Sequence, residues 1–276
     1  MSYFRRAVNL LREDGPKGLA YGVGRFSKNR SRRAFGSLKR RNRSLMYRVK
    51  YRQAAPESYR VISIDPDLVD YILAPRFQSE LSRQGTYIRD GGWDQSVDDS
   101  LVFAGCYEDG FSTKSRVAIP FNNYGLYQSC VRHFDCGVPW EDTEFYQWLL
   151  ENIDKNISRY SSQKEIRDRL AYIDDLYYDM KTDGYKTQDA LNERPNRTSG
   201  YDEVLVNVGR DGRFILDDGR HRLTLAKVLG LDRVPVRIFV RHSEWQQLRY
   251  SVATTDSGTI SDYFNMGLNH PDLVDL

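Results

Sequence analysis

The fold of this chain is decided by one stretch, Phe214-Ile215-Leu216-Asp217-Asp218-Gly219-Arg220-His221-Arg222-Leu223-Thr224-Leu225-Ala226. Its apolar start predicts the end of a strand, and the Asp-Gly pair that follows predicts a turn. Three cationic or ionisable side chains then lead into a helix that is expected over residues 221–229. The first N–H groups of a helix have no partner within it, and Arg or His beside them suits an anion, most often a phosphate. The stretch therefore predicts a strand–turn–helix corner that binds phosphate.

The segments around this corner predict an alternation of strands and helices. Asp211-Gly212 is a hairpin signal between a strand over 204–208 and its return strand over 213–216. The apolar residues Ile166, Leu170 and Ile173 repeat at intervals of three and four, as the core-facing side of a helix over 162–180 should. The remaining patterns predict strands at 60–64, 116–119 and 234–240, and helices at 65–72, 140–152 and 243–251.

This order of elements resembles the ParB/sulfiredoxin-like fold, whose families end the second hairpin strand in a G-x-x-R or D-G-H-H-R box. The match depends on Asp218-Gly219-Arg220-His221-Arg222, on the helix with Ala226 and Leu229-Gly230, and on the strand that starts with Val234-Pro235-Val236. The similarity spans residues 115–242 and is tight from 204 to 240. It implies the α+β class, with a small mixed sheet and packed helices. The basic segment before this domain is expected to form a helical arm. The expected domains are the basic amphipathic arm (1–55), an N-terminal α/β extension (56–114), the ParB/sulfiredoxin-like domain (115–252) and a polar C-terminal tail (253–276).

Families of this fold use the box in different ways. ParB-type proteins bind the triphosphate of CTP with it and have been considered nucleases, and the matching positions here are Gly219 to Arg222. Free-serine kinases use a similar box on the phosphates of ADP, and this chain differs from that box at one position. Sulfiredoxins have a reactive Cys where this chain has Arg220, so sulfinic-acid reduction is not implied.

The residue types in the box suggest a role for each position. Gly219 lets a ligand approach the backbone closely, and Arg220, His221 and Arg222 are expected to bind the phosphates of a nucleotide, together with Arg210 before the hairpin. His221 and Asp218 are the candidate catalytic residues, because each can donate or accept a proton. Asp217 and Asp218 are the candidate ligands of Mg²⁺, which takes one or two carboxylates beside phosphate oxygens. Phosphoryl transfer needs mainly positioning and charge neutralisation, so this set would suffice.

Structural interpretations of the same residues stay open. Asp218-Gly219 can be a plain turn with Asp217 as the helix cap, and His221 can be a structural histidine. Arg210 can be a surface charge. Arg241-His242 can close the last strand by packing alone.

The charge is divided unevenly along the chain. Residues 1–52 hold sixteen Lys or Arg and two acids, which is a net charge of +14, whereas the remainder is acidic at −11. The basic segment can lie on an anionic membrane, with residues such as Phe4, Leu11 and Phe26 in the interface. It can instead bind nucleic-acid phosphates, or dock on the acidic body of the same chain.

Taken together, the sequence predicts a protein that binds a nucleotide (ATP, ADP or CTP) with Mg²⁺ and can act as a small-molecule phosphotransferase of the kinase type. The alternatives are a nucleic-acid-binding protein or nuclease that uses the same phosphate site, and a non-catalytic scaffold. A cytoplasmic location, with peripheral attachment to the inner membrane face, is expected for three reasons. The chain has no apolar run of about 18 residues, no secretory signal, and three cysteines without a C-x-x-C pair.

Overall fold

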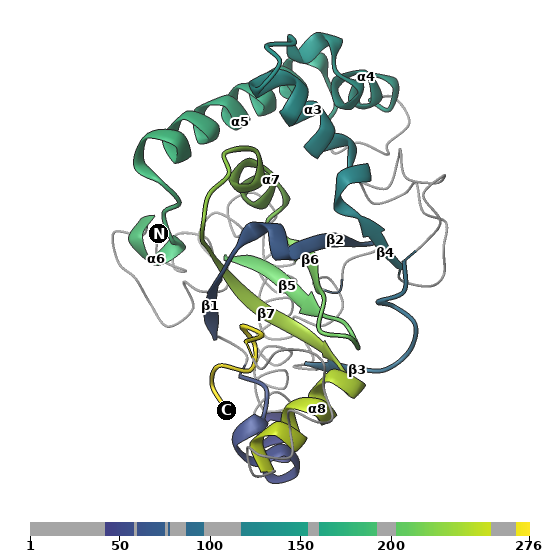
Figure 1. The fold of residues 1–276 in the computed structure, drawn as a ribbon. Helices are drawn as coiled ribbons and strands as arrows, with labels where there is room; N and C mark the ends of the chain where they lie inside the picture. The colour runs from purple at the N-terminus through teal and green to yellow at the C-terminus, as the bar shows by residue number, and fades with distance from the viewer. Residues whose placement is uncertain are drawn as a thin grey trace, which may run out of the picture.

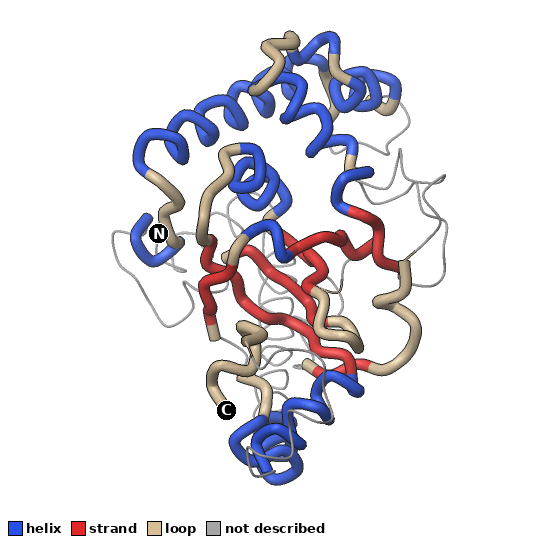
Figure 2. The backbone as a smooth tube through the Cα atoms, in the orientation of Figure 1, coloured by secondary structure: helices blue, strands red, loops and turns tan. Residues whose placement is uncertain are grey.

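The computed structural model describes residues 42–57, 60–74, 77, 87–96, 117–153, 160–191, 203–254 and 269–276. A mixed sheet forms the centre of the fold (Figures 1 and 2), and its strands run in the order β1-β7-β5-β6-β2-β4, with β3 paired to β7. Its strands are β1 (Val61–Ile64), β2 (Val69–Ala74), β3 (Ile88–Arg89), β4 (Val117–Pro120), β5 (Val204–Val208), β6 (Phe214–Asp218) and β7 (Val234–His242).

The sheet is mixed because both hairpins and crossovers build it. β5 and β6 form the predicted antiparallel hairpin, while β5 with β7 and β2 with β6 pair in parallel. β5 and β7 are central, and every residue of β5 is buried. The run Val-Leu-Val-Asn-Val suits that place, because a strand covered on both faces needs apolar side chains in succession.

The helices gather at two ends of the molecule (Figure 2). At one end lie α3 (Gly125–Phe134), α4 (Glu144–Glu151), α5 (Gln163–Asp183) and α7 (Arg220–Val228), with the short α6 (Gln188–Leu191) after α5. At the other end lie α8 (Ser243–Thr254), the 3-10 turn η1 (Arg52–Ala54) and a helix over 42–51. The predicted stripe of Ile166, Leu170 and Ile173 on α5 is buried in the main core, beside α3, α4 and α7.

Most of the elements predicted between residues 162 and 251 form, and the α+β class is confirmed. Ser162 caps α5 by accepting from Glu165 N, and Thr143 caps α4 by accepting from Tyr146 N. The helix predicted at 65–72 is wrong: Asp65 caps a single 3-10 turn, η2 (Pro66–Leu68), and the chain continues as β2. β2 pairs with both β4 and β6, and those long-range partners decide its structure.

The expected division of the chain is not seen in the sheet. β1, β2 and β3 belong to the predicted extension at 56–114, yet they pair with β7, β6 and β4 as parts of one sheet. At the other end of the chain, residues 269–276 of the predicted tail pack on the body, and Asp272 is fully buried. Residues 1–41 of the predicted arm lie outside the described residues. Within the described ranges, no helix has the length and hydropathy that a membrane span requires.

Candidate functional site

The predicted corner forms where β6 ends and α7 begins. Gly219 is the N-cap of α7 with φ of +90°, and it makes no side-chain cap for the helix. A Cβ at Gly219 would lie 2.9 Å from the Cα of Val204, so the close approach of β5 as well as the backbone conformation requires glycine. The glycine therefore has a structural role, and it leaves the first turn of α7 without a side-chain cap.

His221, on the first turn of α7, contacts an arginine from another helix. Arg169 of α5 places Nη2 at 3.0 Å from Nδ1 of His221 and at 3.5 Å from Nε2. A guanidinium can only donate, so the imidazole accepts and is neutral in this arrangement. The guanidinium also lies over the ring of Tyr172, with 4.6 Å to the centroid. In the described ranges, no carboxylate lies within ion-pair distance of Arg169.

Arg222 contacts a buried carboxylate only loosely. Its Nη1 lies 3.4 Å from Oε2 of Glu203 and 3.2 Å from the hydroxyl of Tyr185. Glu203 accepts a shorter bond, of 2.6 Å, from the backbone N–H of Gln188. Burial raises the pKa of Glu203 in spite of the nearby guanidinium, and burial also raises the pKa of Tyr185. Glu203 and Tyr185 thus hold the Arg222 side chain at the start of α7.

The remaining two residues of the box, Asp218 and Arg220, lie at the junction of β6 and α7. Oδ1 of Asp218 accepts from the N–H of Gly219 at 2.9 Å, and Arg220 is 8% exposed. The described contacts at the start of α7 include the guanidinium groups of Arg169 and Arg222, and cations beside a helix N-terminus suit an anion.

Asp217 does not take part in this corner, so the predicted pair of metal ligands is not formed. Its side chain is fully buried, and Oδ2 accepts from Nδ2 of Asn207 at 2.9 Å and from the N–H of Phe77 at 3.0 Å. Asn207 in turn accepts from the N–H of Val240, so the carboxylate ties β6 to β5 and β7. It is not the cap of α7 either. Across the part of the chain that is described, no group of three His, Cys, Asp or Glu is arranged to hold a metal ion.

Arg210 lies at the opposite end of the hairpin, and its assignment to the phosphate site is wrong. β5 runs from Val204, beside Gly219, to Val208, and Arg210 follows in the turn that leads to β6. Its guanidinium grips Asp94 with Nε and Nη2, at 3.0 and 2.9 Å, and its N–H donates to the same carboxylate at 2.7 Å.

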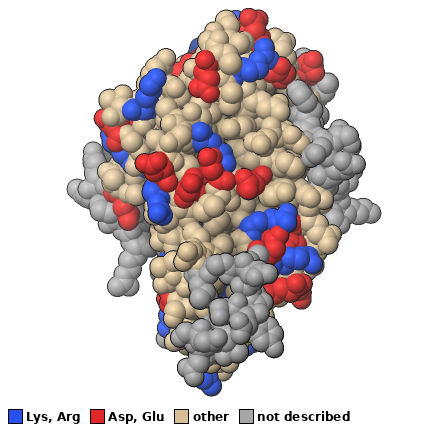
Figure 3. Space-filling model, in the orientation of Figure 1, with Lys and Arg blue, Asp and Glu red and all other residues tan. Residues whose placement is uncertain are grey.

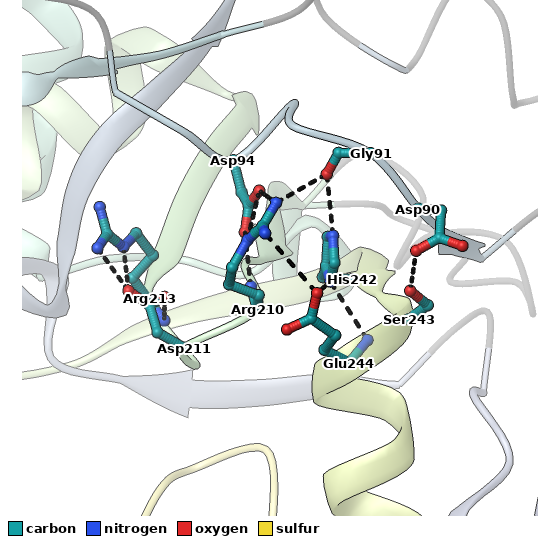
Figure 4. A network of polar contacts seen from close by, with 9 residues as sticks. All are labelled: Asp90, Gly91, Asp94, Arg210, Asp211, Arg213, His242, Ser243 and Glu244. Atoms are coloured by element: carbon teal, nitrogen blue, oxygen red, sulfur yellow. Dashed lines mark hydrogen bonds and ion pairs between the residues drawn. The ribbon is translucent and has the colours of Figure 1, made fainter.

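Asp94 holds a structural network around Arg210 (Figure 4). Burial opposes the charge of Asp94, but the bonds from Arg210 outweigh it and the pKa of that carboxyl is lowered. Nη2 of Arg210 and the ring of His242 both reach the carbonyl of Gly91, at 2.9 and 3.0 Å. Ser243 donates to Asp90. The network fixes the 90–94 loop against the hairpin turn and the start of α8.

Arg241, at the end of β7, also has a structural role. It is fully buried and donates to both oxygens of Asp272, at 2.8 and 2.6 Å. Trp245 donates to Asp272 at 2.9 Å, and Arg249 lies 3.3 Å from it. The packing interpretation of Arg241-His242 is therefore the one that the structure supports, and it explains why residues 269–276 are held on the body.

Sequence reasoning missed three residues of the corner: Arg169, Tyr185 and Glu203. Glu203 directly precedes β5, and Arg169 lies on the partly exposed side of α5. Only the packing of α5 on α7 brings Arg169 to His221, and no local pattern signals that contact. An open groove of about 1190 Å³ lies away from the box, beside the hairpin turn, and no residue of the box lines it.

Comparisons of the chain with family models, with curated proteins and with solved structures found no significant match. The resemblance to the ParB/sulfiredoxin-like fold stays a prediction.

Proposed function

We propose that the corner at the N-terminus of α7 binds the phosphate groups of a nucleotide or of another phosphorylated small molecule. The proposal depends on one observation, the contact of 3.0 Å between Arg169 and His221. It brings a guanidinium that has no carboxylate partner among the described residues to a helix N-terminus that has no side-chain cap. Such a site offers an anion backbone N–H donors, a positive helix end and a bidentate side chain together.

Arg222 is the second phosphate ligand in this proposal. It lies on the first turn of α7 beside His221, and its planar guanidinium can bind two phosphate oxygens at once. Glu203 and Tyr185 would then position Arg222 from behind, as buried polar groups often do for a binding residue.

Phosphoryl transfer is the reaction that we propose for this site, with ATP, ADP or CTP as the nucleotide. When a bound phosphate draws the Arg169 guanidinium away, the ring nitrogen of His221 that accepts from it would be released and could take a proton from an acceptor hydroxyl. Asp218 is half-buried at the same strand end and is the remaining candidate ligand for Mg²⁺, because Asp217 is enclosed. The ParB/sulfiredoxin-like resemblance supports this assignment, since families of that fold use the matching box on nucleotide phosphates.

The experiment that tests the proposal is titration calorimetry of the full chain with ATP, ADP and CTP, with and without Mg²⁺. Arg169→Ala and Arg222→Gln are expected to weaken binding by about tenfold to a hundredfold, because a bond to a charged group contributes about 1.5–3 kcal/mol. Arg167→Ala is the matched control: it lies two residues away on α5, and its nearest carboxylate, that of Glu141, is 3.9 Å distant.

Equal affinities of Arg167→Ala and Arg169→Ala would refute the site. Binding of short DNA or RNA, lost in Arg169→Ala while mononucleotides do not bind, would favour the nucleic-acid alternative. If the wild-type protein binds none of these ligands, the proposal is wrong and a non-catalytic scaffold is the remaining alternative. We also propose a cytoplasmic location at the inner membrane face, for which the 42–51 helix is the described element.

A further inference from the structure

The helix over 42–51 exposes an apolar face to solvent. Leu45 is 54% exposed, Met46 69% and Val49 83%. Residues spaced by three and four positions lie on one side of a helix, so these three side chains form a single patch. A soluble protein shows scattered apolar residues on its surface, but a contiguous set on one helix face marks an interaction site.

The opposite side of the same helix is anchored, so the patch cannot turn inward. Tyr51 is buried, and its ring lies 6.0 Å from that of Tyr250 on α8 in an edge-on contact. Just after the helix, the carbonyl of Ala54 accepts from Gln246 at 2.7 Å, and Gln53 donates to the carbonyl of Ala253 at 2.6 Å. The helix is therefore fixed beside α8, as Figure 1 shows at the lower end of the molecule.

Cations border the apolar patch, and Glu57 shares a groove with Arg48 and Arg52 just after the helix. Arg48, Lys50 and Arg52 are exposed, and Arg43 is half-buried. From Gly15 to Pro56 the sequence contains no Asp or Glu. By helical spacing Arg43 and Lys50 lie along one side of the patch and Arg48 along the other. An apolar stripe bordered by Lys and Arg is typical of a helix that lies in the interface of an anionic bilayer.

We propose that the 42–51 helix docks the protein on an anionic phospholipid bilayer, with Leu45, Met46 and Val49 in the acyl boundary and the flanking cations among the headgroups. Nucleic acid is the weaker candidate, because its phosphates need cations but offer no partner for three exposed aliphatic side chains. The proposal is independent of the phosphate site.

The fold sets the orientation of the bound protein. Val204, beside the phosphate corner, pairs near the start of β7, whereas α8 follows the end of β7. The docking helix and the corner therefore lie at opposite ends of the sheet. Figure 3 shows a row of acidic side chains, with Lys and Arg side chains beside it, across the face between these ends. The bound protein would face the bilayer with its α8 end and present the corner to dissolved ligands.

The test places an environment-sensitive fluorophore on the docking helix. Val49→Cys in a Cys106→Ser, Cys136→Ser background is labelled with nitrobenzoxadiazole and mixed with phosphatidylcholine vesicles that contain about 30% phosphatidylserine. Cys130 stays, because it is buried and burial raises the pKa of its thiol. Leu191→Cys, 58% exposed on α6, is the matched control. A blue shift and a rise in emission are expected at position 49 and not at position 191.

A second measurement separates this helix from the rest of the basic segment. Met46→Glu with Val49→Glu should weaken cosedimentation with the same vesicles by about tenfold or more, whereas Leu191→Glu should not change it. Cosedimentation without a blue shift at position 49 would overturn the proposal. So would equal shifts with vesicles that lack phosphatidylserine, or a shift produced by duplex DNA and not by vesicles.

Discussion

Asp272→Asn is expected to destabilise the protein more than any other conservative change in the last eight residues. The carboxylate is fully buried and receives two bonds from Arg241, one from Trp245 and a longer contact from Arg249. An amide keeps one acceptor, but it places an NH₂ group against a guanidinium and removes the only buried negative charge of the cluster. Arg241 then loses the carboxylate that it holds with two bonds, while Arg249 keeps its pair with Asp275.

The expected cost is about 3–5 kcal/mol, the range found when one partner of a buried ion pair is removed. The loss of two charge-assisted hydrogen bonds, at about 1.5–3 kcal/mol each, gives a similar figure. For a chain of this size such a change lowers the unfolding temperature by about 10 °C. Urea unfolding followed by circular dichroism measures it, with Asp275→Asn as the comparison: that side chain is 27% exposed, and solvent can replace part of what Arg249 and Arg60 give it, so its cost should be the smaller of the two.

The pH dependence adds a second check on the same carboxyl. Burial opposes the charge, but the two arginines outweigh it, and the pKa of Asp272 is lowered. Its contribution is therefore complete above the unfolded pKa of about 3.9 and is lost as the pH falls through the lower folded value. The difference between wild type and Asp272→Asn should be equal at pH 7 and pH 5. A loss below about 1 kcal/mol, or one no larger than that of Asp275→Asn, would refute the reasoning.

Two further predictions concern residues near this cluster. Burial lowers the pKa of His270, so the folded state favours its neutral ring, and stability should fall as the pH drops below about 6.5. His270→Gln should reduce this dependence, measured as the difference in unfolding free energy in urea between pH 7 and pH 5. An unchanged difference would contradict the prediction. Arg210→Ala should leave ligand binding at the α7 corner unchanged but speed amide hydrogen exchange at 90–94 by about tenfold, because Asp94 and Gly91 lose their shared donor; weaker ligand binding with unchanged exchange would contradict the placement of Arg210.

The part of the fold that could be predicted is the part that local sequence decides. The β5–β6 hairpin, the turn at Gly219 and helix α7 follow from residues that are adjacent in the chain. The segment after Asp65 was predicted as a helix because Asp-Pro starts one, and the same pair also caps the single turn η2. Only pairing with β6 and β4, strands that are distant in the sequence, makes the following residues a strand.

Only those residues of the candidate site that are adjacent in the sequence could be predicted. Gly219, His221 and Arg222 lie together because the box is contiguous, whereas Arg169 precedes His221 by 52 positions. The error on Arg210 differs: although its partner Asp94 is 116 positions away, a strand separates Arg210 from the box. The predicted hairpin turn at Asp211-Gly212 already placed Arg210 at the far end of the return strand from the box, so this error could have been avoided from the sequence.

The arginines of this domain differ in whether a buried carboxylate neutralises them, and this difference indicates their roles. Arg210 and Arg241 each hold a buried carboxylate with two nitrogens, so their bonding capacity is used in fixing the fold. Arg222 lies 3.4 Å from the buried Glu203, whereas Arg169 contacts an imidazole and no described carboxylate. A cation that an enclosed acid neutralises contributes to stability, while a half-buried cation without such an acid attracts an anion from outside. The arginines thus divide into a structural group around Asp94 and Asp272 and a candidate binding residue, Arg169, beside the start of α7.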